Sequence, residues 1–290
     1  MKPFQYHEPE SIPEACRLLT VYGDRARLMA GGTDLVIQMK RGHLSPGHVI
    51  SIKKIEALHG ITETAEGFTI GAATSLADVA NHARLQEILP MVCRAALSVG
   101  STQVRNRASI GGNICNGAPS ADMAPGLLAL GAQVAIAGVD GDRMIPVASF
   151  FTGPGTILLG KGEIVSRLFI PRPSENLRMV YIKHGPRQSM DCAVVGVAIC
   201  LSIDPVTRLC QDVRIALGAV APTPVRAVAT EALIAGKKLS ELDFKTIESL
   251  VRTEASPISD VRASAAYRSE MVSTLTTRAI ENLRGAAREL

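Results

Sequence analysis

Residues 103–132 of the chain read QVRNRASIGGNICNGAPSADMAPGLLALGA, and residues 28–42 read LMAGGTDLVIQMKRG. Each stretch holds one of the two GG pairs of the sequence, Gly31-Gly32 and Gly111-Gly112. Glycine lets the backbone approach an anion closely and take a positive φ, so that successive N–H groups converge on phosphate oxygens. The two pairs therefore predict a place where main chain meets a bound anion.

Polar side chains stand beside both pairs: Thr33 and Asp34 follow the first, and Ser109 and Asn113 flank the second. A helical stretch, residues 35–40, follows the first pair and would add the free N–H groups of its first turn. A tight turn would also explain either pair by itself. Together the pairs favour a pyrophosphate held by two loops from different parts of one domain.

Two widespread nucleotide-binding motifs are missing from the sequence. No GxxxxGK[ST] segment occurs, which argues against a Walker-type nucleoside triphosphatase. No GxGxxG segment follows a strand, which argues against a Rossmann dinucleotide site. The residues alone lead no further than a pyrophosphate site.

The composition is that of a compact globular protein. Apolar residues make up 47% of the 290 residues and charged residues 20%, whereas Trp is absent and aromatic residues are only 3%. The core must therefore be aliphatic. The net charge is +4, with Lys and Arg scattered among Asp and Glu, which argues against a nucleic-acid-binding surface.

The sequence contains six cysteines, which are Cys16, Cys93, Cys115, Cys192, Cys200 and Cys210. Because none forms a CxxC pair or clusters with histidine, we expect thiols in a reducing compartment and no metal or iron–sulfur ligation by this chain. The N-terminal segment lacks an apolar signal region, and no run approaches 18 uninterrupted apolar residues. These features predict a soluble, cytoplasmic protein.

Local signals predict the order of elements. Ser11 with Pro13 opens a helix that Gly23 ends after Tyr22. Further helices are expected at residues 35–40, 84–98, 121–130 and from 227 onward, with another opened by Ser75. Strands are expected at 28–30, 48–52, 67–71, 132–137, 143–147 and within 177–220. Residues 100–113 show neither the 3.6-residue periodicity of a helix nor the two-residue periodicity of a strand. This order predicts an α+β protein of two domains joined near residues 171–176.

The full amino-acid sequence of the two glycine-rich stretches allows a more specific inference. Both resemble the flavin-binding loops of the FAD subunits in the xanthine dehydrogenase and carbon monoxide dehydrogenase family, closest to the separate medium subunits of bacterial xanthine-dehydrogenase-like enzymes. Similar segments extend over almost the whole chain: TIGAATSLADV (69–79), FTGPGT (151–156), GEIVSRLFIP (162–171), MDCAVVGVAI (190–199) and ALGAVAPTPVRA (216–227).

The resemblance implies an FAD-binding domain of the vanillyl-alcohol-oxidase (PCMH) type over residues 1–175, made of two α/β subdomains at about 1–58 and 59–175. A C-terminal domain like that of the carbon monoxide dehydrogenase flavoprotein, an antiparallel sheet with helices, is implied over residues 176–290.

The resemblance also implies the residues that touch FAD. The first loop should wrap the pyrophosphate with its backbone N–H groups, and the second should complete that cradle. Asp122 matches an acidic residue that fixes the adenosine part, and Lys183 matches a lysine near the flavin end. The implied contacts are Met29, Ala30, Gly31, Gly32, Thr33, Asp34, Val99, Gly100, Ala108, Ser109, Gly112, Asn113, Asp122, Ile164, Val165 and Lys183.

Plainer roles exist for several of these residues. Asp122 precedes a helix and could be its N-cap, and Lys183 could be a solvated strand lysine. Ile164 and Val165 could be ordinary core. Two further candidates, Arg105 and Arg107, could meet phosphate, or could face another subunit or solvent.

The chain also departs from some relatives. It lacks the inserted segment whose cysteines hold an extra iron–sulfur cluster, so Cys115 and Cys192 are interpreted as thiols. No histidine stands where a covalent flavin link would form, so the resemblance implies a non-covalently bound FAD. It implies no metal-ligating residue in this chain.

The function implied by the resemblance is an electron relay with no catalytic side chain of its own. Electrons from a molybdenum–pterin centre on a large subunit would pass through two [2Fe-2S] clusters on a small subunit to this FAD, and then to NAD+, O2 or a quinone. The implied assembly is a dimer of heterotrimers. Two alternatives stay open: a stand-alone flavin-dependent reductase or oxidase, and a scaffold subunit without cofactor.

Overall fold

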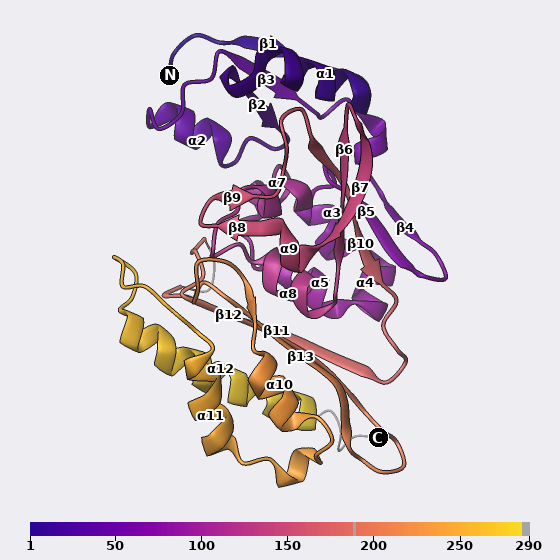
Figure 1. Ribbon diagram of the computed structural model, residues 1–290, viewed down its shortest axis with the longest axis vertical. Coiled ribbons are helices and arrows are strands. Elements are labelled where there is room, and N and C mark those ends of the chain that lie inside the picture. The colour runs from indigo at the N-terminus through magenta and orange to yellow at the C-terminus, as the bar shows by residue number, and fades with distance from the viewer. Residues whose placement is uncertain (188–189, 286–290) are drawn as a thin grey trace.

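The N-terminal part of the chain forms a three-stranded parallel sheet with two helices. The structure, a computed structural model, describes residues 1–187 and 190–285 (Figure 1). The strand order is β1-β3-β2, with bounds Gln5–His7, His48–Ser51 and Ala26–Met29. The sequence did not predict β1. Helices α1 and α2 run over Ile12–Tyr22 and Leu35–Lys40, and short 3-10 turns cover Gly23–Arg25 and Glu56–Leu58.

Helix α1 begins and ends where its sequence predicts. The Ser11 hydroxyl accepts a hydrogen bond from the Glu14 N–H at 3.3 Å, and Gly23 ends the helix with a φ of +53°. Its inner face, Ala15 and Cys16, packs in one cluster with Ile50 of β3. Local capping thus sets the length of the helix, and burial of small residues sets its orientation.

A five-stranded antiparallel sheet, in the order β4-β5-β10-β6-β7, forms the middle of the molecule (Figure 1). The strand bounds are Ile61–Glu63, Gly67–Gly71, Ile164–Pro171, Gln133–Gly138 and Gly141–Pro146. Strand β10 lies between β5 and β6, although it follows β5 by about a hundred residues of chain. A two-stranded ribbon accompanies this sheet, formed by Phe151–Gly153 (β8) and Thr156–Ile157 (β9).

Seven helices pack beside this sheet. Their bounds are Leu76–Asn81 (α3), Ala83–Ile88 (α4), Pro90–Leu97 (α5), Thr102–Arg105 (α6), Ile110–Cys115 (α7), Met123–Ala129 (α8) and Val147–Phe150 (α9). The stretch 100–113, expected to lack helix, therefore contains α6 and the start of α7. Each of these is capped by a serine, Ser101 or Ser109, and so short a helix leaves no periodic pattern.

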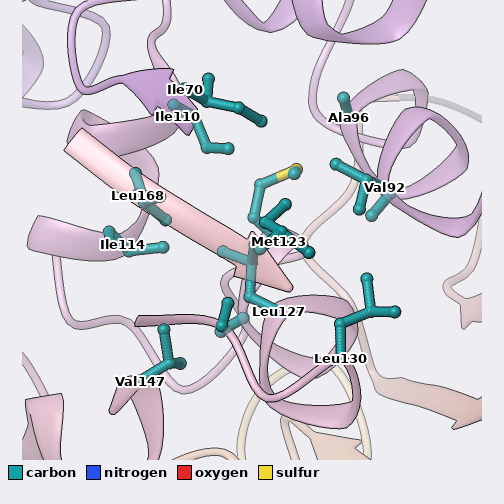
Figure 2. Close-up of a cluster of buried hydrophobic side chains, with 14 of the residues drawn as sticks. Ile70, Val92, Ala96, Ile110, Ile114, Met123, Leu127, Leu130, Val147 and Leu168 are labelled. Carbon is teal, nitrogen blue, oxygen red and sulfur yellow. The ribbon is translucent and has the colours of Figure 1, made fainter. Parts of the chain in front are cut away.

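Helix α8 is the centre of the largest core cluster. All of its residues are buried, which suits a helix with small and aliphatic side chains on every face. Figure 2 shows Met123 and Leu127 of α8 between Leu168 of β10 and Val92 of α5. The aliphatic core expected from the lack of aromatic residues is thus organised around one helix.

The C-terminal part is a four-stranded antiparallel sheet followed by helices, in the order β11-β12-β13-β14. The strand bounds are Leu177–His184, Val195–Ile203, Cys210–Gly218 and Val225–Arg226. The helices are Val228–Ile234 (α10), Phe244–Thr253 (α11) and Ala265–Gly285 (α12), with a 3-10 turn at Leu239–Glu241. No helix of the described residues is long and apolar enough to cross a membrane.

This sheet is buried on both faces. Every residue of β12 is buried, because one face of the sheet packs on α8 and the other on α12 (Figure 1). The close approach to α8 requires a glycine: a Cβ at Gly218 would lie 2.6 Å from Pro125 Cγ. The C-terminal sheet is therefore fixed directly against the central helix of the preceding part.

One buried cation ties α12 to its sheet. Arg268 is only 3% exposed and donates to the carbonyl groups of Val194 at 2.7 Å and Ala219 at 3.0 Å. Its guanidinium also meets the Asp260 carboxylate at 2.8 Å. Hydrogen bonds from the Arg262 backbone, together with Arg268, lower the pKa of Asp260 to about 2.

We predict that Asp260→Asn destabilises the protein at neutral pH and matters less in acid. Since the folded-state pKa lies below the unfolded one, the stabilisation is complete above about pH 4 and is lost as the pH falls towards 2. The difference in Tm between wild type and variant should therefore shrink over that range. Asp24→Asn, which changes an exposed carboxylate, is the control; a difference that does not change with pH would contradict the prediction.

Candidate functional site

The first glycine-rich loop connects β2 to α2 at the carboxyl edge of the parallel sheet. Among the described residues, no hydrogen bond uses the backbone N–H of Gly31, Gly32, Thr33, Asp34 or Leu35. Consecutive free N–H groups at the start of a helix, next to a glycine with a φ of +75° at position 32, form a site suited to an anion.

The two glycine-rich stretches touch each other through main chain. A Cβ at Gly31 would lie 1.8 Å from the Arg107 carbonyl oxygen and 2.9 Å from the Ala108 nitrogen, so only glycine fits here. A short antiparallel bridge between Ser75 and Ser109 holds the second stretch from its other side. The sequence prediction that both stretches meet at one place is consistent with this contact.

The second stretch offers fewer free donors than the first. Its Gly112 N–H bonds the Ser109 hydroxyl at 3.1 Å, and its Asn113 N–H bonds the Ser109 carbonyl at 3.0 Å. Asn113 Oδ1 in turn accepts from the Met123 N–H at 3.3 Å. The sequence suggested a free loop at the second pair of glycines. In the structure this pair lies in the first turn of α7 instead. What remains available is the exposed surface of Gly112 and the Asn113 amide nitrogen.

A small pocket opens at the junction of the two stretches. Its volume is about 450 Å³, and its lining includes Ala30, Gly31, Asn106 and Arg107. Lys53 also lines it, so the lining holds two cationic side chains against one carboxylate, that of Asp78. The pocket and the free N–H groups beside it therefore favour a negatively charged guest.

A second polar cluster lies where α8 meets strand β11. The Asp122 carboxylate accepts from Lys183 Nζ at 2.8 Å and from the Tyr181 hydroxyl at 3.1 Å. Lys183 Nζ also donates to the Ser98 carbonyl oxygen at 2.8 Å. The ion pair is nearly enclosed, because the side chains of Lys183 and Asp122 are 14% and 8% exposed.

This cluster bears on three expectations. Asp122 stands at the N-cap position of α8, but its side chain makes no capping hydrogen bond there and pairs with Lys183 and Tyr181 instead. Lys183 is not a solvated strand lysine. Lys183 Nζ lies 2.8 Å from the Asp122 carboxylate, so the two residues form one polar cluster; the part of FAD that each would contact stays a prediction.

Burial governs the protonation of the cluster. It raises the pKa of Asp122, while the neighbouring Lys183 opposes that shift. It also raises the pKa of Tyr181 well above its ordinary value, helped by the charge of Asp122. Tyr181 therefore stays a neutral donor, and the positive charge of Lys183 favours the ionised form of the carboxylate against the effect of burial.

The remaining candidates are spread more widely. Ile164 and Val165 are 1% and 5% exposed on β10 and belong to two different cores, so they have the burial of ordinary core residues. Gly100 has a φ of +52°, and its carbonyl accepts from the Met190 N–H at 3.2 Å. Val99 is half-buried beside it.

The two arginines and the start of the first loop complete the set. Arg105 bonds the Val99 carbonyl at 3.1 Å, and Arg107 is exposed. The Met29 sulfur would lie 3.3 Å from a Cβ at Gly32. Ala108 is buried.

Tyr181 and Ser98 belong to the polar cluster around Asp122 but were not predicted from the sequence. Tyr181 could have been found, because residues two apart on a strand share a face and Lys183 was already a candidate. Ser98 acts through its main-chain carbonyl, which carries no sequence signal. The six cysteines are free; burial raises the pKa of Cys115 and of Cys200 to about 12.

Comparisons with known proteins cover the chain almost from end to end. The model of the family "FAD binding domain in molybdopterin dehydrogenase" matches residues 2–173, and that of the "CO dehydrogenase flavoprotein C-terminal domain" matches residues 180–283.

Similar whole proteins include subunits of several dehydrogenases. The xanthine dehydrogenase FAD-binding subunit of Escherichia coli O157:H7 is 34% identical, over 97% of this chain and 96% of that protein. The carbon monoxide dehydrogenase medium chain of Hydrogenophaga pseudoflava is 32% identical, over 96% of each. A solved structure of carbon monoxide dehydrogenase from Hydrogenophaga pseudoflava contains a chain with a TM-score of 0.93 and 33% identity, covering 97% of this chain and 98% of that one.

The enclosed ion pair generates a prediction about stability. Lys183→Met leaves the Asp122 carboxylate buried without its counter-charge, which should lower the free energy of unfolding by about 3 kcal/mol. Adding Asp122→Asn should recover part of this loss. Lys54→Met, which removes an exposed partner of Glu8, is the control and should cost under about 1 kcal/mol. Equal losses in both lysine variants, measured by urea unfolding, would contradict the buried pair.

Proposed function

Because the chain belongs to the family of FAD-binding subunits of molybdenum hydroxylases, we propose that it holds FAD and relays electrons between a partner subunit and a final acceptor. Its folds match those of the family: a PCMH-type FAD-binding domain and a carbon monoxide dehydrogenase flavoprotein C-terminal domain. It is the flavoprotein component of an oxidoreductase.

The observation that carries the proposal is the row of free N–H groups from Gly31 to Leu35. FAD has a pyrophosphate, and consecutive main-chain donors at a helix start suit phosphate oxygens. The absence of a Cβ at Gly31 and Gly112 leaves room for main chain and anion to approach closely. The residues present therefore fit the cofactor.

We assign the contacts as follows. The first loop holds the pyrophosphate by its N–H groups, and the second contributes the bare surface of Gly112 and the Asn113 amide. Asp122 and Lys183 serve one end of FAD together, and Tyr181 orients the carboxylate. Val99 and Gly100 extend the same wall, whereas Ile164 and Val165 support it from within the core.

Bound FAD would supply the electron-carrying chemistry, which no side chain of this protein provides. The chain binds and orients it. Lys183 places a fixed positive charge beside Asp122. No general acid or base is needed for a relay, so no catalytic residue is assigned.

The surrounding assembly follows from the proposed role. A small subunit with [2Fe-2S] clusters would deliver electrons from a large molybdenum–pterin subunit, and NAD+, O2 or a quinone would receive them. We propose a dimer of heterotrimers in the cytoplasm. The domain limits we propose are 1–175, with subdomains at about 1–58 and 59–175, and 176–290; the matched ranges 2–173 and 180–283 support them.

If the chain is a relay, the organic substrate of the natively purified complex should not reduce the flavin of the isolated, FAD-loaded chain. The same substrate should reduce that flavin once the partner subunits are added. Dithionite, which needs no partner, is the control for a reducible flavin. The absorbance near 450 nm follows the reaction.

Two results would favour the alternatives. Rapid bleaching of the isolated chain by an organic substrate would indicate a stand-alone flavin enzyme. A protein that stays colourless after incubation with FAD would indicate a scaffold subunit.

The loop contact predicts the effect of Gly31→Ala. Its Cβ would push the Arg107 carbonyl away, separate the two stretches and weaken FAD binding at least about tenfold, which is about 1.4 kcal/mol. Gly47→Ala is the matched control, because the nearest atoms to its Cβ lie at 3.9 Å. Fluorescence titration of the apoprotein with FAD measures both affinities, and circular dichroism checks the fold. Equal FAD affinity in the two variants would refute the proposed cradle.

A further inference from the structure

The two edges of the C-terminal sheet differ. Strand β14, at one edge, has two residues, and the helix α10 follows it directly. An ion pair between Arg226 and Glu231 closes this edge further. Strand β11, at the other edge, has eight residues and, within residues 1–187 and 190–285, pairs only with β12. Half of its main-chain N–H and C=O groups therefore point away from the sheet, which is the arrangement that invites another strand.

The open edge of β11 forms the floor of a groove of about 1120 Å³. One wall is helix α5, which contributes Arg94 and Leu97, and Asn282 of α12 stands on the other side. The lining of this groove includes no residue of the loops 30–34 or 109–113. It touches the cofactor site only at Ser98, Tyr181 and Lys183 and runs from there along β11 and α5.

The groove has a basic wall with one uncompensated charge. Of its other cations, Lys183 is paired with Asp122 and Arg187 with Asp191. Arg94 is exposed, and its guanidinium makes no hydrogen bond or ion pair within the described part of the chain. Leu97, 42% exposed, adds an apolar contact one helical turn away. An occupant should therefore carry a carboxylate opposite Arg94 and an apolar group near Leu97.

We propose that the groove receives an extended, acidic segment of a partner subunit, which adds to the C-terminal sheet as a strand beside β11. An extended backbone matches the alternating donors and acceptors of an eight-residue edge, which a compact small molecule does not. A second copy of this chain is less suited, because it would set one basic wall and its Arg94 against another, and helices α5 and α12 pack beside each β11. The inference rests on the proposed function in assuming partner subunits.

The strand addition would place the partner beside the Asp122–Lys183 cluster. The same strand, β11, carries Tyr181 and Lys183 on the face towards α8, so a segment bound along its edge would brace the residues that we assign to FAD. Assembly and cofactor positioning would then share one structural element.

Hydrogen exchange of the purified complex and of the FAD-loaded isolated chain tests the strand. We expect the main-chain amides of residues 178–183 to exchange at least tenfold more slowly in the complex. Equal exchange rates in a complex that forms and transfers electrons would overturn this inference and leave the proposed function intact. Slowing caused by a nicotinamide nucleotide added to the isolated chain would overturn it as well, in favour of a small-molecule groove.

Charge reversal tests the acidic partner. Arg94→Glu should weaken association with the partner subunits at least tenfold without changing the FAD content or Tm of the isolated chain. Arg17→Glu, on an exposed position of α1, is the matched control and should assemble like wild type. Unchanged assembly of Arg94→Glu would refute the contact, whereas failure of the wild-type chain to bind any partner would refute the proposed function itself.

Discussion

A single close contact, between Gly31 and the carbonyl group of Arg107, determines how the N-terminal half of the molecule is assembled. A Cβ would come within 1.8 Å of that oxygen, so two stretches 76 positions apart can meet only because a glycine stands there. The contact brings the carboxyl edge of the parallel sheet against the start of α7. The N–H groups of the first stretch make no hydrogen bond within the described residues, so the binding surface that we propose is backbone more than side chain.

The same principle operates between the two halves of the chain. A Cβ at Gly218 would come within 2.6 Å of Pro125, so the C-terminal sheet lies directly on α8. At the end of this packed interface, the two halves are joined by the ion pair of Asp122 and Lys183 and not by apolar side chains. An enclosed ion pair contributes little net stability but is costly to break, so it fixes the register of the two halves where the proposed cofactor reaches both.

A relay subunit needs a rigid cofactor cradle and surfaces for its neighbours more than it needs reactive side chains. The thiols of this chain are consistent with that role, since burial raises the pKa of Cys93 and of Cys210 to about 11 and keeps them protonated. The open edge of β11 gives such a chain a means of joining its cradle to a neighbour. Binding, positioning and assembly then depend on the same few strands.

The sequence by itself determined the elements whose signals are local. Ser11 and Gly23 set the ends of α1, and the residues of the glycine-rich stretches indicated the family. Tertiary structure decided which N–H groups stay free, since those of the second stretch are used by Ser109 while those of the first are not. It also decided that Asp122 pairs with Lys183, and that β10 lies between β5 and β6. These features depend on contacts between residues far apart in the chain, and a local pattern of residue types contains no information about which distant atoms will meet.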